Sequence, residues 1–143
     1  MELSITSVDE MQTYAADMAQ DLPAGTIIAL IGELGSGKTT FCQGLARGLG
    51  VIENVTSPTF KLVSEYRGER YWFYHVDCYR LSSPEEFLNI DGEKYLSPNQ
   101  GISAIEWADK IEMLFSDGVI KIIFSRIPGE SNSRNLKIYG WVQ

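Results

Sequence analysis

The order of hydrophobic and polar positions changes twice within the first fifty residues. Ser7 opens a capping box, and the apolar residues after it recur every three or four positions, which predicts a helix over residues 8–21. Residues 26–31 (TIIALI) are a continuous apolar run, typical of a strand that is covered on both faces. Helical spacing returns at Lys38, and Gly50 is placed to end this second helix in a left-handed conformation.

The rest of the chain alternates between strand-like and polar segments. Strand-like composition occurs in residues 60–66, 70–77, 102–106, 119–127 and 136–142. The first two predict a hairpin, the last two are joined by a polar loop that includes residues 128–133, and a short helix is expected to begin at Ser83. Strands mixed with helices and at least two hairpins predict an α/β fold with a mixed, partly antiparallel sheet flanked by helices.

Composition indicates an ordinary folded chain. Its 143 residues are 44% hydrophobic and 22% charged, which predicts a single domain over residues 1–143 and excludes a disordered or collagen-like protein. The formal net charge of −7 disfavours autonomous binding to nucleic acid, because an acidic surface repels the phosphate backbone.

The cysteine pattern and the N-terminal sequence indicate in which cellular compartment the protein is expected. Cys42 and Cys78 form neither a CxxC pair nor a metal-ligand cluster in the sequence, which favours a reducing compartment. The first residues lack a basic stretch followed by an apolar one, and the longest apolar run, residues 27–31, is far shorter than the roughly 20 residues of a membrane span. We therefore expect a cytoplasmic protein that does not contact a membrane.

Between the apolar strand and the second helix, residues 32–39 (GELGSGKT) satisfy the pattern G-x-x-x-x-G-K-[ST], in the context of a phosphate-binding loop. Glycines let the backbone turn tightly and aim successive N–H groups at one anion, and the helix N-terminus adds partial positive charge. The residues expected to bind a nucleotide are Gly32, Glu33, Leu34, Gly35, Ser36, Gly37, Lys38, Thr39 and Thr40.

Three residues at the end of this loop favour a nucleoside triphosphate with Mg²⁺ as the ligand. Lys38 supplies a mobile positive charge for the β- and γ-phosphates, and the Thr39 hydroxyl is a ligand for octahedral Mg²⁺. A dinucleotide site is disfavoured, because Thr40 stands where its third glycine or alanine belongs. No guanine-reading Asn-Lys-x-Asp sequence occurs in the chain, so ATP is the expected nucleotide.

Two acids follow strand-like runs and are candidates for the metal and the attacking water. Glu106 ends the run ISAIE, which resembles a Walker B strand, and Asp77 ends the run YWFYHVD. We predict that Glu106 faces the Mg²⁺ together with Thr39, and that Asp77 orients water. The reverse assignment stays open at this point. The predicted catalytic residues are Asp77, Lys38 and Glu106.

Four blocks of the chain stand out together: GELGSGKTT at residues 32–40, SPTF at 57–60, HVDCYRL at 75–81 and EWA at 106–108. In these blocks and in their order the chain resembles the TsaE family, small P-loop ATPases required for bacterial tRNA threonylcarbamoyladenosine synthesis. The resemblance implies a single α/β domain that binds ATP and Mg²⁺ and hydrolyses ATP slowly when alone. It also implies that hydrolysis resets a complex with two threonylcarbamoyl-transfer proteins, so that the chain reaches tRNA only indirectly.

The same resemblance implies roles for residues outside the loop. Ser57 and Thr59 would form a switch-like loop that senses the γ-phosphate. His75 shares the strand face of Asp77, and it either orients that acid, approaches the phosphates or is a structural histidine. Trp107 adjoins the proposed metal acid and either senses the nucleotide or packs.

Two other functions remain open at this point. A small-metabolite kinase would use the same phosphate cradle, but it would need an arginine-rich lid, and the arginines, including Arg126 and Arg134, are scattered. A nucleotide-gated binding module would need ATP to be bound but not hydrolysed. No motif marks the adenine site, for which the segment around Ser7 is the candidate.

Overall fold

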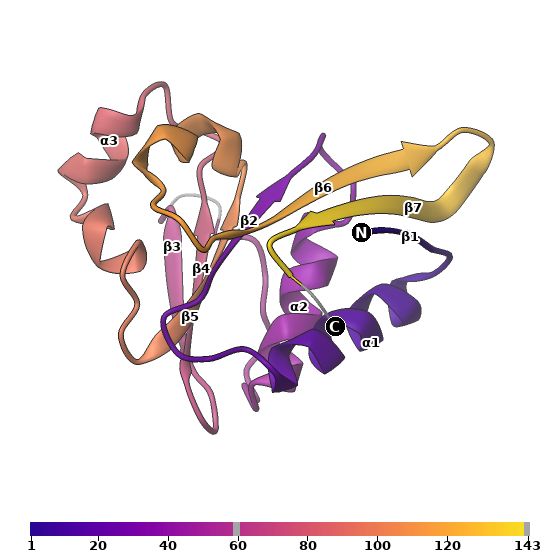
Figure 1. Ribbon diagram of the computed structural model, residues 1–143, viewed down its shortest axis with the longest axis horizontal. Helices are drawn as coiled ribbons and strands as arrows, with labels where there is room; N and C mark the ends of the chain where they lie inside the picture. The colour runs from indigo at the N-terminus through magenta and orange to yellow at the C-terminus, as the bar shows by residue number, and fades with distance from the viewer. Residues whose placement is uncertain (59–60, 142–143) are drawn as a thin grey trace.

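The computed structural model describes residues 1–58 and 61–141. Within them the strands are β1 (Glu2–Ile5), β2 (Ile27–Ile31), β3 (Val63–Arg67), β4 (Trp72–Asp77), β5 (Gly101–Glu106), β6 (Ile120–Ile127) and β7 (Glu130–Tyr139). The helices are α1 (Val8–Gln20), α2 (Lys38–Gly48) and α3 (Pro84–Asn89), with the 3₁₀ helices η1 (Gly92–Tyr95) and η2 (Ala108–Leu114). These strands form one sheet in the order β1-β7-β6-β2-β5-β4-β3 (Figure 1).

Parallel pairing occupies the middle of the sheet. β2 lies between β5 and β6 and is parallel to both, and β4 is parallel to β5. The outer pairs β3–β4, β6–β7 and β1–β7 are antiparallel, which confirms the predicted mixed sheet. Because neighbouring parallel strands end at the same edge of a sheet, the segments after β2, β4 and β5 lie close together.

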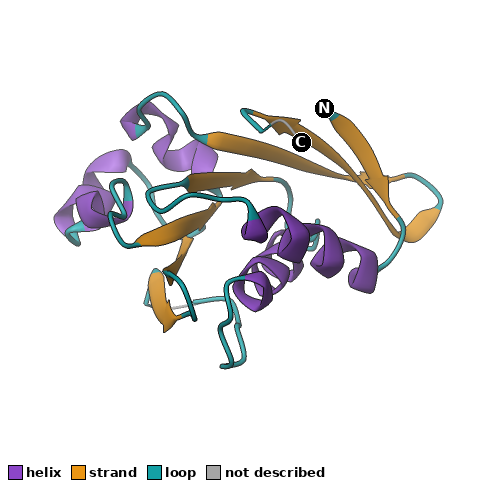
Figure 2. Cartoon of the chain, turned by 60° about the horizontal axis from the view of Figure 1, so that its bottom comes forward, coloured by secondary structure: helices purple, strands orange, loops and turns teal. Residues whose placement is uncertain are grey.

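Alternate residues of β2 face opposite sides of the sheet, which explains its unbroken apolar sequence. Ile28 and Leu30 belong to the core that packs against α1 and α2. Ile27 and Ala29 belong to the core on the side of α3 and η2. Figure 2 shows these two groups of helices on opposite sides of the strands. α1 begins at the predicted cap, where the Ser7 hydroxyl accepts a backbone N–H at 3.0 Å.

The C-terminal hairpin differs most from the prediction. We expected a strand over residues 136–142, but β7 begins at Glu130, so residues 131–133 belong to the strand and not to a loop. Val142 lies outside the described residues. The side chains from Glu130 to Asn132 are exposed, and therefore no hydrophobic pattern marks this part of the strand.

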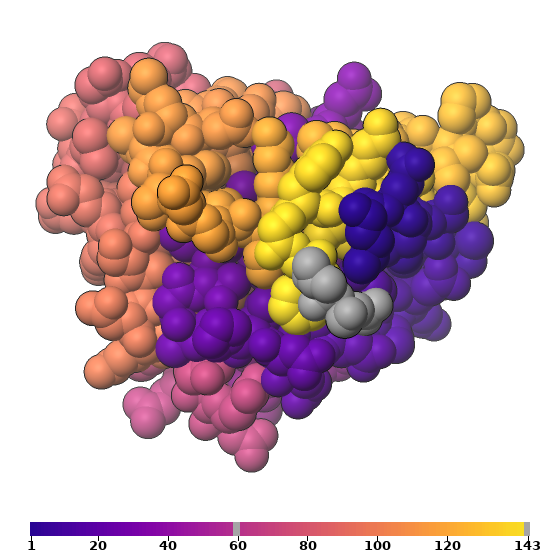
Figure 3. All heavy atoms as spheres, viewed as in Figure 1, coloured from indigo at the N-terminus to yellow at the C-terminus, as the bar shows by residue number. Residues whose placement is uncertain are grey.

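Two further kinds of element were not predicted. β1 is four residues long and pairs with β7, where Figure 3 shows the indigo N-terminal residues against the yellow strand. The 3₁₀ helices η1 and η2 are short and lack a repeating apolar pattern. No helix in the described part of the chain is long and apolar enough to cross a membrane.

Candidate functional site

The turn between β2 and α2 has the backbone of an anion cradle. Gly35 and Gly37 adopt positive φ angles of +75° and +110°, which residues with side chains rarely tolerate. α2 begins directly after Gly37, without a side-chain cap and without an acid in its first turn. The N–H groups of this first turn therefore have no intrahelical partner, and they lie at the positive end of the helix.

Lys38 is buried against this turn. The residue is 4% exposed, and its ammonium donates to two carbonyl oxygens of the loop, including that of Glu33 at 2.9 Å. It also lies over the Trp107 ring, 4.3 Å from the centroid. Burial lowers the pKa of Lys38 from its ordinary value, and the carboxylates of Glu106 and Asp77 oppose this shift. Lys38 thus places positive charge between the loop and the two acids.

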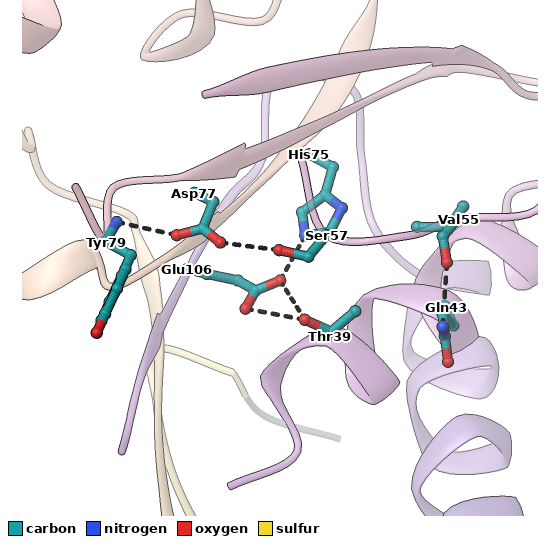
Figure 4. A network of polar contacts seen from close by, with 8 residues as sticks. All are labelled: Thr39, Gln43, Val55, Ser57, His75, Asp77, Tyr79 and Glu106. Carbon is teal, nitrogen blue, oxygen red and sulfur yellow. Dashed lines mark hydrogen bonds and ion pairs between the residues drawn. The ribbon is translucent and has the colours of Figure 1, made fainter. Parts of the chain in front are cut away.

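Glu106 ends β5 inside the protein, where it is 3% exposed. The Thr39 hydroxyl lies 3.1 and 2.9 Å from its two carboxylate oxygens, so the two predicted metal ligands are in contact (Figure 4). Nε2 of His75 lies 2.5 Å from Oε2 of Glu106. Of the three roles left open for His75, orientation of Asp77 lacks a contact among the residues that the structure describes, because β5 brings the Glu106 carboxylate to the ring.

Asp77 lies opposite Glu106 in the β4–β5 register but has different partners. The Ser57 hydroxyl donates to Oδ2 at 3.0 Å, and the backbone N–H of Tyr79 donates to Oδ1 at 2.9 Å (Figure 4). Asp77 is half-buried. The segment that contains Ser57 is thereby tied to the end of β4.

These side chains line a cavity of about 460 Å³. The predicted site residues in its walls are Leu34, Gly35, Gly37, Lys38, Thr39, Thr40, Asp77 and Glu106. Gly32, Glu33 and Ser36 belong to the same loop, but they are not among the lining residues. Thr59, which we expected to sense the γ-phosphate, lies outside the described residues.

Two arginines of the β6–β7 hairpin also contact the loop. Arg126 and Arg134 are register partners, and they donate to the carbonyl oxygens of Leu34 at 3.2 Å and Gly35 at 3.1 Å. The sequence marked these arginines only as scattered lid candidates. The sequence does not predict that these two arginines lie opposite each other, because the strand register shifts between Arg126 and Ile127.

Trp107 occupies an unusual backbone conformation next to Glu106. Its φ angle is +56°, in the left-handed region that is costly for a residue with a bulky side chain. The ring packs against Tyr79, with centroids 5.0 Å apart, and lines the cavity. Trp107 therefore packs against its neighbours and at the same time borders the site.

The site has the arrangement of the phosphate-loop class of nucleotide-binding α/β proteins. A strand leads into a glycine-rich turn and then into a helix that begins with Lys38 and Thr39. Acids at the ends of two neighbouring strands lie beside this turn. A family model described as "Threonylcarbamoyl adenosine biosynthesis protein TsaE" matches residues 5–136. The chain belongs to the TsaE family.

Individual relatives agree with this assignment. The tRNA threonylcarbamoyladenosine biosynthesis protein TsaE of Synechocystis is 40% identical over 123 residues, which cover 80% of this chain and 74% of the relative. The protein of the same name from Bacillus subtilis is 36% identical over 118 residues, or 82% of this chain and 73% of the relative. The crystal structure of Bacillus subtilis YdiB superposes with a TM-score of 0.73 at 27% identity, covering 96% of this chain and 83% of that one.

Proposed function

We propose that this protein binds ATP and Mg²⁺ at the phosphate loop, hydrolyses ATP slowly and serves in the biosynthesis of threonylcarbamoyladenosine in tRNA. The observation that carries the proposal is the contact of Thr39 with Glu106 directly beside the anion cradle. It joins a loop suited to phosphates with a pair of oxygen donors suited to a divalent ion.

The donor set fits Mg²⁺. A threonine hydroxyl and a carboxylate are hard oxygen ligands, and Mg²⁺ usually keeps waters in its remaining positions. Thr39 and Glu106 would hold the ion, which when bound neutralises charge on the phosphates. Lys38 and the amides at the start of α2 would bind the phosphate oxygens.

Asp77 is the better placed of the two acids to orient water. Both acids line the cavity, but Asp77 is held by Ser57 and by the Tyr79 amide, whereas Glu106 is engaged by Thr39 and His75. A carboxylate fixed in this way can accept a proton from a water aligned with the γ-phosphate. Since Ser57 belongs to the SPTF block, a movement of that segment would change the orientation of Asp77.

The start of α1 supplies the proposed adenine site. Ser7, Val8 and Met11 line the same cavity as the phosphate loop. Val8 and Met11 offer apolar surface to a flat base, and Ser7 offers a polar edge. This arrangement supports the segment around Ser7 as the adenine site.

The pathway follows from the names of the relatives. They are tRNA threonylcarbamoyladenosine biosynthesis proteins, and we extend that process to this chain. With a net charge of −7, the chain would reach tRNA through two threonylcarbamoyl-transfer proteins and not through a basic face of its own. ATP hydrolysis would reset that complex between rounds.

The test is an ATP hydrolysis assay with three additions. The protein is measured alone, with candidate small-molecule phosphate acceptors, and with the two threonylcarbamoyl-transfer proteins. We expect slow turnover alone and stimulation by the two proteins together. A phosphorylated metabolite would instead establish the kinase, and ATP binding that supports modification without hydrolysis would establish a nucleotide-gated module.

A further inference from the structure

A second group of ligand-type side chains lies behind the nucleotide cavity. Cys42 on α2, His75 on β4 and Glu106 on β5 each place a possible ligand atom within 4.8 Å of the others. Cys42 and His75 are fully buried, and Glu106 is 3% exposed. In the sequence Cys42 fits no metal-ligand cluster, and the fold brings His75 and Glu106 close to it from distant segments.

The two ring nitrogens of His75 have different surroundings. Nε2 of His75 contacts Glu106 (Figure 4), while Nδ1 is buried and has no hydrogen-bond partner among the described residues. A buried nitrogen without a partner is explained by an ordered water, an ion or a functional role. Nε2 faces Glu106, so it is the nitrogen that would share an ion with that carboxylate, and Nδ1 would then carry the imidazole proton.

The three donors differ in kind from those proposed for Mg²⁺. A thiolate, an imidazole nitrogen and a carboxylate oxygen form the set that Zn²⁺ binds in proteins, and Mg²⁺ disfavours sulfur and nitrogen ligands. We propose that Cys42, His75 and Glu106 form a binding site for Zn²⁺ or another thiophilic divalent ion, with the fourth position open to the cavity. This site goes beyond the proposed ATPase function and shares one residue, Glu106, with it.

The geometry requires only side-chain adjustment. Tetrahedral Zn²⁺ with bonds of about 2.0–2.3 Å separates its ligand atoms by about 3.3–3.6 Å. The short His75–Glu106 contact would open by roughly 1 Å, and the widest separation, at most 4.8 Å, would close by a similar amount. Glu106 lines the cavity, so an ion can enter from that side. On binding, the Cys42 thiol releases its proton to solvent, the His75 ring carries its proton on Nδ1, and the thiolate and Nε2 bind the metal.

Occupancy of this site would oppose Mg²⁺ binding. Glu106 now accepts a hydrogen bond from Thr39, and a carboxylate drawn toward Cys42 and His75 leaves that hydroxyl. The thiophilic ion and Mg·ATP would then compete for one carboxylate. The site would make nucleotide binding sensitive to zinc.

The chain offers a matched control for the test. It contains one histidine and two cysteines, so Cys42→Ser can be compared with Cys78→Ser. Both thiols are buried, and burial raises both pKa values, that of Cys78 to about 12. The Cys78 side chain belongs to the core on the opposite side of the sheet from Cys42, although its backbone N–H donates to the Glu106 carbonyl oxygen at 3.0 Å.

The first measurement titrates the full, nucleotide-free chain with Zn²⁺ by calorimetry and with Co²⁺ by absorption. We expect one ion per chain for the unchanged protein and for Cys78→Ser, with a thiolate-to-cobalt charge-transfer band. Cys42→Ser should bind about tenfold or more weakly and lack the band. Equal Zn²⁺ affinity in Cys42→Ser, or no thiolate-to-cobalt band in the unchanged protein, overturns the proposal. The band is measured in the unchanged protein, so it tests the site even if Cys42→Ser does not fold.

The second measurement tests the competition. Protein loaded with Zn²⁺ and freed of excess ion is compared with metal-free protein for Mg·ATP affinity, in the unchanged chain and in Cys78→Ser. We expect Zn²⁺ to weaken Mg·ATP binding in both, and identical affinities would refute the shared carboxylate. Because the first measurement uses no nucleotide, failure of the zinc site and failure of the proposed ATPase function give different results.

Discussion

The phosphate loop is bordered by two flanks that differ in burial and in bonding. The acid flank consists of Asp77 and Glu106 at the ends of β4 and β5, and its carboxylates are bonded by hydroxyl, imidazole and amide groups. The arginine flank consists of Arg126 and Arg134 of the β6–β7 hairpin, which donate to carbonyl oxygens of the loop. Glu106 is 3% exposed and Asp77 is half-buried, whereas Arg126 is exposed and Arg134 is half-buried.

The difference indicates a division of labour. A buried carboxylate interacts strongly with the groups that donate hydrogen bonds to it, because little water competes for them. Arginines that bond a backbone carbonyl near the surface contribute less, and they act on the shape of the loop. We therefore expect variants of the acid flank to change the chemical step or metal binding, and variants of the arginine flank to change nucleotide affinity only.

The largest effect should come from Lys38, which lies between the flanks. Lys38→Ala removes the charge that is to face the β- and γ-phosphates and leaves two carboxylates near the cavity without it. Several charged hydrogen bonds of about 1.5–3 kcal/mol each are lost, so ATP affinity should fall by roughly 100-fold or more. Calorimetry measures this change. Lys121→Ala, a surface variant, is the control, and unchanged ATP binding in Lys38→Ala would contradict the assignment of the loop.

Within the acid flank, the isosteric pair Glu106→Gln and Asp77→Asn separates metal binding from water activation. Glu106→Gln should weaken ATP binding in the presence of Mg²⁺ more than in its absence, because a hard anionic ligand is lost. Asp77→Asn should keep Mg·ATP affinity and lower kcat by about 100-fold, in the range of general-base variants. Binding titrations with and without Mg²⁺, combined with turnover, distinguish the two.

The opposite pattern would reverse the roles of the acids. If Asp77→Asn loses Mg²⁺-dependent affinity while Glu106→Gln retains it, Asp77 is the metal ligand. If both variants hydrolyse ATP at the normal rate, neither acid takes part. Thr39→Ala provides an independent check, since it should lose Mg²⁺-dependent affinity as Glu106→Gln does.

The two flanks also differ in how far the sequence predicts them. Asp77 and Glu106 each end a strand whose apolar pattern is visible, and parallel strands bring their carboxyl ends to one edge, so their proximity could be predicted. Arg134 follows a polar stretch of β7 in which Glu130 to Asn132 are exposed, and a register shift separates Arg126 from the turn. His75 illustrates a third case: its strand was predicted, but its partner depends on the β4–β5 register.

Ser57→Ala should produce a smaller effect on the acid flank. The hydroxyl donates one hydrogen bond to Asp77, while the Tyr79 amide still holds the other oxygen. Loss of one such bond, worth about 1 kcal/mol, should lower kcat roughly fivefold without changing Mg·ATP affinity. Ser57→Thr keeps the hydroxyl and should restore most of the rate. A normal kcat in Ser57→Ala would show that this bond does not orient the acid.

The arginine flank should give the smallest effect and the sharpest contrast. Arg134→Ala removes the donor to the Gly35 carbonyl oxygen but leaves the glycine turn and Lys38 in place. ATP and ADP should therefore each bind about threefold to fivefold more weakly, and kcat should not change. Arg126→Ala should act similarly, and the double variant should lose at least the product of the two factors, because the arginines hold adjacent carbonyl oxygens. Nucleotide titrations and steady-state turnover on the three variants measure this. A fall in kcat with unchanged affinity would mean that an arginine acts on the charge that develops during phosphoryl transfer, and the two flanks would then share the chemistry.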